Sequence, residues 1–180
     1  MRLHEKAWVK RGFTLIELVV VISIISVLMA VALNRTVIYQ EQAEKAAVEQ
    51  LLGTLRSALH LQIADLLIKG KTNEISRLVE HNPMDWLAEK PANYAGEYYT
   101  PKPDMVEAGN WYFDAHDKTL VYLVHHQAHL HTAAGEANKL RFSARLVTST
   151  PGSAGGGATE SSRPSVEGVV LEPVVSYHWF

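Results

Sequence analysis

The chain has 180 residues, with 17 lysines and arginines against 19 aspartates and glutamates, a formal net charge of −2, and no cysteine. This balance does not favour a nucleic-acid-binding protein, which usually concentrates basic residues. A chain without cysteine forms no disulfide, and its length suits one globular domain with a real core.

The N-terminus reads as a basic leader followed by a membrane span. Residues 1–12 carry four basic side chains against one acid, and an almost unbroken apolar run of 21 residues extends from Phe13 to Leu33. At about 1.5 Å per residue, this helix would be about 31 Å long and would match a hydrocarbon core of about 30 Å. The basic leader favours a cytoplasmic N-terminus and an extracytoplasmic remainder.

Glu17 is the unusual residue of this span. An ionisable side chain within a membrane costs about 2.5 to 3.5 kcal/mol on insertion scales, so it normally marks a partner or a pathway. We therefore expect Glu17 to meet a cation.

Two interpretations leave Glu17 without a role. A secretory signal cut at Ala30-Val31-Ala32 would release a soluble product that begins at Leu33. A plain signal anchor would keep the chain in the membrane. Neither needs a carboxylate at the start of the apolar run.

The sequence GFTLIE at residues 12–17, after a basic leader and before an apolar helix, resembles the class III signal of type IV pilins and type II secretion pseudopilins. The resemblance implies that a prepilin peptidase cuts between Gly12 and Phe13 and methylates the new amine of Phe13. It also implies that Glu17 of an incoming subunit pairs with the Phe13 amine of a neighbour, which makes Glu17 an assembly residue.

The resemblance further implies a pilin-like α+β fold and a structural role. The expected protein is a subunit of a type IV pilus or type II secretion pseudopilus. A minor component is favoured, because many major pilins carry a disulfide and this chain has no cysteine. Its partners would be the prepilin peptidase, other pilin or pseudopilin subunits, the inner-membrane assembly platform and the lipid bilayer, with no nucleic acid. It would start in the bacterial inner membrane as a single-pass protein. The alternative is a membrane-tethered extracytoplasmic binding module that does not polymerise.

A single stem helix is predicted from Thr14 to Lys69. Its transmembrane half is residues 13–33, and its amphipathic half is residues 34–69. Apolar residues recur at three- and four-residue intervals in the second half, the pattern of a helix with one buried face: Val48, Leu51, Leu52, Leu55, Leu59, Ile63, Leu66 and Leu67. Glu41, Glu44, Lys45, Glu49 and Arg56 are expected on other faces. Gly70 provides a helix stop.

Residues 70–180 are expected to form the globular head, with short helices and a loop in 70–110. One short helix is predicted over Asn73–Glu80, capped by Thr72 or Asn73, and another over Pro83–Glu89, capped by Asn82. Trp86 and Leu87 should point inward. Three prolines in Lys90–Asn110 indicate a loop.

A small antiparallel sheet that covers the stem is predicted for residues 110–180. Asn110–Asp114 and Thr119–Val124 should form a hairpin, and Leu140–Thr148 alternates like a half-buried strand. Residues 149–164 are rich in glycine and serine and predict a flexible loop. A last strand is expected from Val166 to Leu171, resuming after Pro173 through Trp179.

The histidines at 125–131 are the main candidates for a metal site. If this segment is extended, His125, His129 and His131 share a face, and imidazoles bind zinc or copper. A polar strand end and loop is the favoured interpretation, because no carboxylate or cysteine stands beside the cluster in the sequence. We therefore expect no cofactor. No nucleophile elbow, phosphate-binding loop or cysteine nucleophile is present, so an enzyme is not expected.

Overall fold

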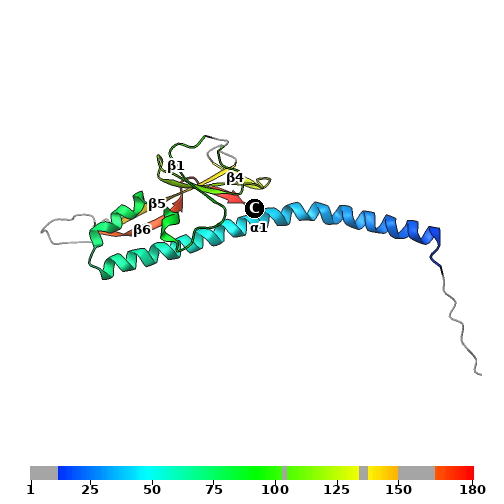
Figure 1. The fold of residues 1–180 in the computed structure, drawn as a ribbon, viewed down its shortest axis with the longest axis horizontal. Helices are drawn as coiled ribbons and strands as arrows, with labels where there is room; N and C mark the ends of the chain where they lie inside the picture. Colours follow the sequence, from blue (N-terminus) through cyan, green and yellow to red (C-terminus); the bar gives the residue numbers. More distant parts are fainter. Residues whose placement is uncertain (1–11, 103–104, 134–137, 150–164) are drawn as a thin grey trace, which may run out of the picture. The chain divides into compact units, whose positions relative to one another are not determined.

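The computed structural model describes residues 12–102, 105–133, 138–149 and 165–180 (Figure 1). The chain divides into two units, the first ending at Gln40 and the second beginning at Glu41.

One long helix, α1 (Leu15–Ile68), runs through the end of the first unit and the start of the second. It agrees with the predicted Thr14–Lys69 to within one residue at each end. Its C-terminus is closed by Gly70, whose φ of 69° suits glycine. The amide of Lys71 donates to the carbonyl of Leu66 at 2.8 Å, and the amide of Gly70 donates to that of Leu67 at 3.1 Å. This pair of bonds is a Schellman motif, which satisfies carbonyls that the helix leaves free.

In the first unit, the apolar side chains of α1 are exposed. Leu15 is 81% and Leu33 is 62% exposed. Among the described residues, α1 is the one helix long and apolar enough to cross a membrane. A helix that is apolar on all sides has no stable place in water, so this part of the chain requires lipid or other proteins around it.

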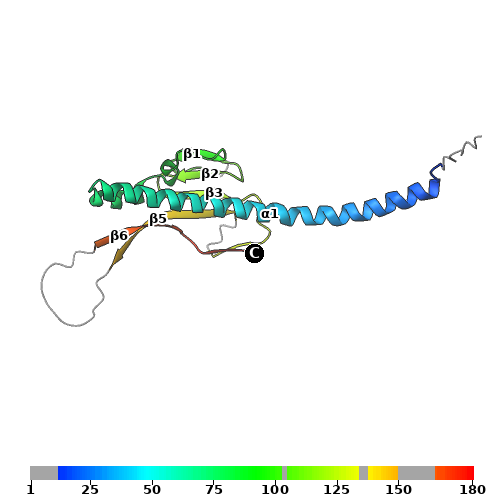
Figure 2. The ribbon, with the colours of Figure 1, turned by 90° about the horizontal axis from the view of Figure 1, so that it is seen from below.

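The second unit places the rest of α1 along a sheet (Figure 2). The sheet has the strand order β1-β2-β3-β5-β6. Its strands are β1 (Tyr94–Tyr98), β2 (Trp111–Asp114), β3 (Thr119–Leu123), β5 (Lys139–Ser149) and β6 (Ser165–Pro173). Two further strands, β4 (Leu130–Thr132) and β7 (Tyr177–Trp179), form a separate antiparallel pair.

The core of this unit lies between α1 and the sheet. Leu55 and Leu59 of α1 are 0% and 1% exposed, and they belong to one cluster with Phe113 of β2 and Phe142 of β5. The helix and the mostly antiparallel sheet therefore form the predicted pilin-like α+β fold. Leu67 departs from the predicted buried stripe, because its side chain is 53% exposed.

The β2–β3 hairpin and the strand β5 are confirmed. Leu140, Phe142 and Ala144 are buried as the alternation predicts, whereas Leu146 is 40% exposed. The strand β6 covers the predicted Val166–Leu171 and pairs with β5 at the edge of the sheet. Pro173 ends β6 at this edge, where a missing amide is tolerated. Of the predicted glycine-rich loop, residues 150–164 lie outside the described residues.

Both short helices are present, but as 3-10 helices. The first, η1 (Thr72–Glu80), has Lys71 at its N-cap with no side-chain bond, so the predicted cap by Thr72 or Asn73 is wrong. The second, η2 (Pro83–Trp86), is capped as predicted by Asn82, which accepts from the Met84 amide at 3.0 Å. It ends three residues before the predicted Glu89.

One prediction about the sheet is wrong. The segment Lys90–Asn110, predicted as a loop, contains β1, which pairs with β2 in parallel. The strand expected after Pro173 is present as β7, which ends at Trp179 as predicted and pairs with β4.

Candidate functional site

The start of α1 is fixed by Thr14. Its hydroxyl lies 3.3 Å from the amide of Glu17 and accepts its hydrogen bond, and its carbonyl accepts from the amide of Leu18 at 3.2 Å. These bonds make Thr14 the N-cap, which satisfies amides that the first turn would leave free. Gly12 and Phe13 precede the helix, and Phe13 is 70% exposed.

Glu17 lies in the first turn of α1 with an exposed side chain. Its carboxylate makes no hydrogen bond or ion pair within the part of the chain that the structure describes. The helix dipole favours an acid at this position by about 0.3 to 1 kcal/mol, which is less than the cost of placing it in a membrane. The charge therefore still needs a partner.

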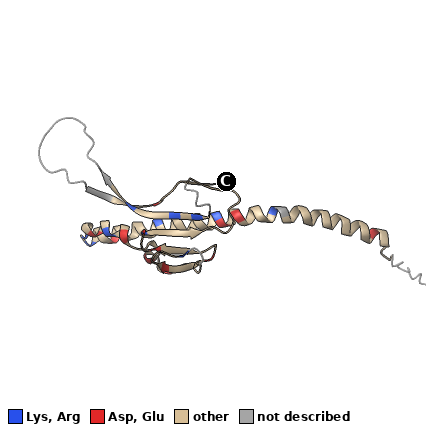
Figure 3. Cartoon of the chain, turned by 90° about the horizontal axis from the view of Figure 1, so that it is seen from above, with Lys and Arg blue, Asp and Glu red and all other residues tan. Residues whose placement is uncertain are grey.

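Between Glu17 and Arg35 the helix has no charged residue (Figure 3). The two serines of this segment are satisfied within the helix itself. Ser23 Oγ donates to the Val19 carbonyl and Ser26 Oγ to the Ile22 carbonyl, both at 2.8 Å. Such bonds to the preceding turn remove the need for water, as a membrane interior demands. Glu17 is thus the one charged group of this segment.

Gly12 has open space around it. A Cβ atom added there would meet no heavy atom within 4 Å, and the same is true of Gly53 in the middle of α1. A larger side chain at either position therefore has room within the protein itself.

Two further glutamates of α1 have many partners. Glu41 is 1% exposed and accepts from the amide and Nδ1 of His129, both at 2.8 Å, and from Trp179 Nε1 at 3.0 Å. The prediction that Glu41 lies on a face away from the core is wrong. The carboxylate joins α1 to the β4 and β7 ends of the head.

Glu44, one turn further along α1, accepts four hydrogen bonds. They come from Tyr122 Oη at 2.9 Å, the His125 amide at 2.6 Å, and the amide and Nδ1 of His126, both at 2.8 Å. We call Glu41 and Glu44 the stem carboxylates. They hold the end of β3 and the following turn against the helix.

The electrostatics of the stem carboxylates reflect these bonds. Burial alone would raise the pKa of Glu41, but the hydrogen bonds from His129 and Trp179 outweigh it and lower the pKa below its ordinary value. Burial, followed by the hydrogen bond to Glu44, raises the pKa of Tyr122 well above its ordinary value. The Glu41 carboxylate is thus stabilised in its charged form.

The histidine segment is not an extended strand along its whole length, because β4 begins only at Leu130. His129 bonds Glu41 and His125 donates its amide to Glu44, so carboxylates accompany the cluster after all. They come from α1, more than 80 residues earlier in the chain. Within the described ranges, no group of three or more His, Cys, Asp or Glu side chains is placed to hold a metal ion.

The C-terminus of the chain contacts the same turn of α1. Lys45 Nζ donates to the carbonyl of Trp179 at 2.8 Å, and the ring of Phe180 stacks on that of His129 with centroids 4.9 Å apart. Glu41, which accepts from Trp179 Nε1, and Lys45 therefore anchor the last residues to α1. Sequence reasoning missed these contacts, because charged residues on an amphipathic helix are usually solvated.

Comparison with known protein families identifies the N-terminal segment. Residues 9–33 match the prokaryotic N-terminal methylation motif, the prepilin-type signal of type IV pilins and pseudopilins. The matched residues include Gly12, Phe13 and Glu17. No curated protein and no solved structure matches the chain. Proteins with this signal are structural and non-enzymatic.

Proposed function

We propose that this prepilin-like subunit is cut between Gly12 and Phe13, methylated on Phe13, and assembled into a type IV pilus or type II secretion pseudopilus. Its N-methylation signal and its hydrophobic helix support the proposal. The prepilin peptidase performs the first two steps. The hydrophobic segment Phe13 to Leu33, most of which lies in α1, provides the assembly surface.

Glu17 is the observation that supports this proposal best. Its carboxylate has no partner in the described chain, and it lies four residues after the proposed new amine. A charge is tolerated at membrane depth when it is paired. The Phe13 amine of a neighbouring subunit supplies the missing cation, so the pair fixes where an incoming subunit stops.

Before assembly the protein resides in the bacterial inner membrane, with its N-terminus in the cytoplasm and residues 34–180 beyond the span. The basic leader supports this orientation. In addition to the peptidase, its partners are other pilin or pseudopilin subunits, the inner-membrane assembly platform and the bilayer.

A minor component is the role we favour. The chain has no cysteine, so its head lacks the disulfide of many major pilins. The folded head instead relies on its core and on the stem carboxylates for its stability.

The test begins with processing. Gly12→Val should leave an unprocessed chain in the membrane, because the peptidase would meet a β-branched residue where it expects glycine. Gly53→Ala is the matched control, since both sites have open space around them. Mass spectrometry of the N-terminus, together with immunoblots of sheared filament fractions, measures both steps.

The expected result is a methylated Phe13 at the N-terminus and the protein in filament fractions for the wild type and for Gly53→Ala. A soluble product that begins at Leu33 would contradict the proposal. A processed protein that never enters filaments would instead support a membrane-tethered binding module.

A further inference from the structure

Two adjacent histidines of the second unit, His125 and His126, have ring nitrogens that the fold of the head does not use. They lie shortly after β3, in the turn that Glu44 holds against α1. His126 donates its Nδ1 proton to Glu44 Oε2 at 2.8 Å, whereas the ring of His125 makes no hydrogen bond or ion pair within the described ranges. The two rings therefore offer Nε2 of His126 and a nitrogen of His125 to a ligand.

Glu44 fixes the tautomer and the orientation of His126. An ionised carboxylate can only accept hydrogen bonds, so the ring proton is on Nδ1 and the free lone pair is on Nε2. The Glu44 side chain is 8% exposed and is itself held by Tyr122 Oη and by the amides of His125 and His126. A carboxylate that orients a histidine through its other ring nitrogen is the usual outer partner of a metal-binding imidazole.

The two imidazole rings are close enough to bind one ion. Their centroids are 4.5 Å apart, and their planes are inclined by 59°. Two imidazoles with metal–nitrogen bonds of about 2.0 Å at a right angle, as in a square-planar site, have centroids roughly 4.5 Å apart. His125 is exposed and the His126 side chain is 30% exposed, so an ion in solvent can reach both rings. The pair can therefore supply two neighbouring ligands, and water can supply the others.

The ligand atoms of this pair determine which ions it suits. They are two imidazole nitrogens, and the chain has no cysteine that could add a thiolate. Imidazole suits Cu²⁺, Ni²⁺ and Zn²⁺, whereas Ca²⁺ and Mg²⁺ prefer oxygen ligands. Among the first three ions, Cu²⁺ binds a given nitrogen site most tightly, and its tetragonal geometry accepts water beside the nitrogens.

We propose that His125 and His126 bind a Cu²⁺ ion, with water in the remaining coordination positions and Glu44 as the positioning residue. His129 is not a ligand, because its Nδ1 bonds Glu41, its ring stacks on Phe180, and no group of three such side chains is placed for one ion among the described residues. Two protein ligands leave coordination positions open, so the ion exchanges with the solvent. This binding does not depend on assembly, since all its residues lie in the second unit.

The test is a Cu²⁺ titration of the full chain in a non-ionic detergent. Glycine as a competing chelator gives the affinity, and pulsed electron paramagnetic resonance counts the imidazoles that bind the ion. We expect one tightly bound Cu²⁺ per chain, with two imidazoles. His125→Gln and His126→Gln should each weaken binding at least tenfold, since even the loss of an outer partner costs about 10- to 100-fold. Circular dichroism checks that each variant is folded.

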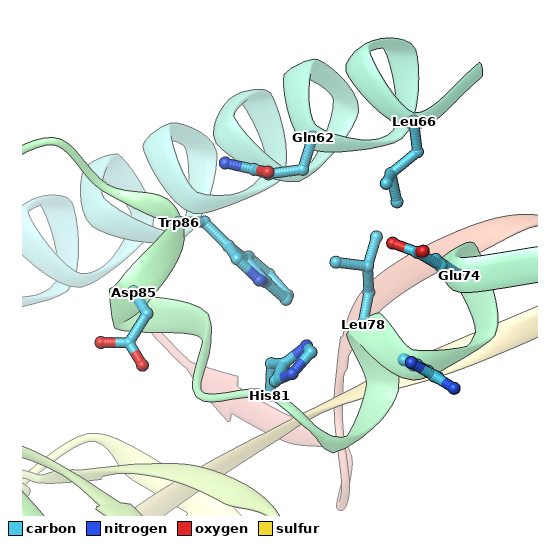
Figure 4. A pocket seen from close by; sticks show the side chains of 8 residues that line it. Gln62, Leu66, Glu74, Leu78, His81, Asp85 and Trp86 are labelled. Atoms are coloured by element: carbon cyan, nitrogen blue, oxygen red, sulfur yellow. The ribbon is translucent and has the colours of Figure 1, made fainter. Parts of the chain in front are cut away.

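His81→Gln is the matched control, because it also removes one exposed imidazole. His81 lines a cavity of about 370 Å³ between α1, η1 and η2 (Figure 4). No second histidine is among the described residues that line this cavity, and its acids are already paired, Glu74 with Lys71 and Asp85 with Lys90. His81→Gln should therefore leave the Cu²⁺ affinity unchanged.

The positioning role of Glu44 is tested by comparing Glu44→Gln with Glu41→Gln. Both variants remove a buried carboxylate that joins α1 to a histidine, but Glu41 orients His129, which is not a ligand. Glu44→Gln should weaken Cu²⁺ binding by about tenfold and keep the signal of two imidazoles. Glu41→Gln should change neither. An equal loss of affinity in both variants would show that Glu44 acts only through the stability of the head.

Absence of a signal from two imidazoles would overturn the proposal. An affinity that both His125→Gln and His126→Gln leave unchanged would do so as well. A loss caused by His131→Gln instead would place the ion on His131 and His178, which face each other across β4 and β7, and would also contradict the proposal. None of these outcomes bears on processing or filament incorporation, so the assembly proposal is judged separately.

Discussion

The carboxylates in the two parts of α1 differ in whether the chain itself supplies their hydrogen-bond partners. In the second unit, Glu41 and Glu44 together accept seven hydrogen bonds, three on Glu41 and four on Glu44. In the first unit, Glu17 has no partner among the residues that the structure describes. A carboxylate that is hydrogen-bonded within the chain stabilises the fold. An unpaired carboxylate in an apolar segment indicates a contact with another molecule.

The apolar side chains make the same contrast. Leu55 is 0% exposed in the head core, whereas Leu28 of the first unit is 63% exposed. The apolar side chains of α1 in the second unit are therefore buried within the chain. Those in the first unit can be buried only by lipid or by neighbouring subunits.

The largest effect on head stability should follow from Leu55→Ala. Deleting a buried leucine leaves a cavity and typically costs about 2 to 5 kcal/mol. Urea unfolding of the full chain in detergent, followed by tryptophan fluorescence, measures the free energy of unfolding of the head. Leu28→Ala is the control and should leave this value unchanged, and an equal loss in both variants would remove the contrast between the two parts.

Glu41→Ala should be the next most damaging change, at about 2 to 3 kcal/mol, because it leaves the buried Trp179 Nε1 without an acceptor. Its control is Glu49→Ala on the same helix. Glu49 has an exposed ion pair with Lys45 at 3.9 Å, of a kind that contributes about 0 to 1 kcal/mol. If both variants unfold at the same urea concentration, Glu41 does not anchor the head.

A smaller effect is expected from acid. The pKa of Glu41 is lowered from its ordinary 4.5, so the ionised carboxylate stabilises the head above about that pH. This stabilisation should decline as the pH falls through the folded-state pKa. Urea midpoints of the wild type and of Glu41→Gln, measured from neutral pH to pH 3, should therefore converge on acidification. Parallel curves would show that Glu41 has no part in the pH response.

Much of the fold could be predicted from local patterns. The absence of glycine and proline between Phe13 and Gln50, with leucines at helical spacing beyond, predicted α1 nearly to the residue. The aromatic and β-branched runs at 111–114 and 119–123 predicted the hairpin for the same reason. Each of these signals lies within a few neighbouring residues.

Features that depend on distant partners could not be predicted in this way. β1 contains Gly96 and pairs in parallel with β2, so its short sequence carries little strand signal. The pairing of β4 with β7 joins segments 45 or more residues apart. Glu41 and Glu44 have the usual appearance of solvated residues on an amphipathic helix until the fold brings His126 and His129 to them. The processing signal at residues 12–17 could be predicted from the sequence, because its residues are consecutive and no distant partner is needed to recognise it.

The role of Glu17 is tested most directly by the fraction of Glu17→Gln protein in sheared filaments, measured by quantitative immunoblot and compared with its processed pool in the membrane. Glutamine keeps the size of the side chain and removes its charge. We expect a normal, methylated Phe13 and an incorporation that falls by tenfold or more, since loss of one partner of a buried pair costs about 3 to 5 kcal/mol. Incorporation equal to that of the wild type would contradict the pairing of Glu17 with a neighbour's amine.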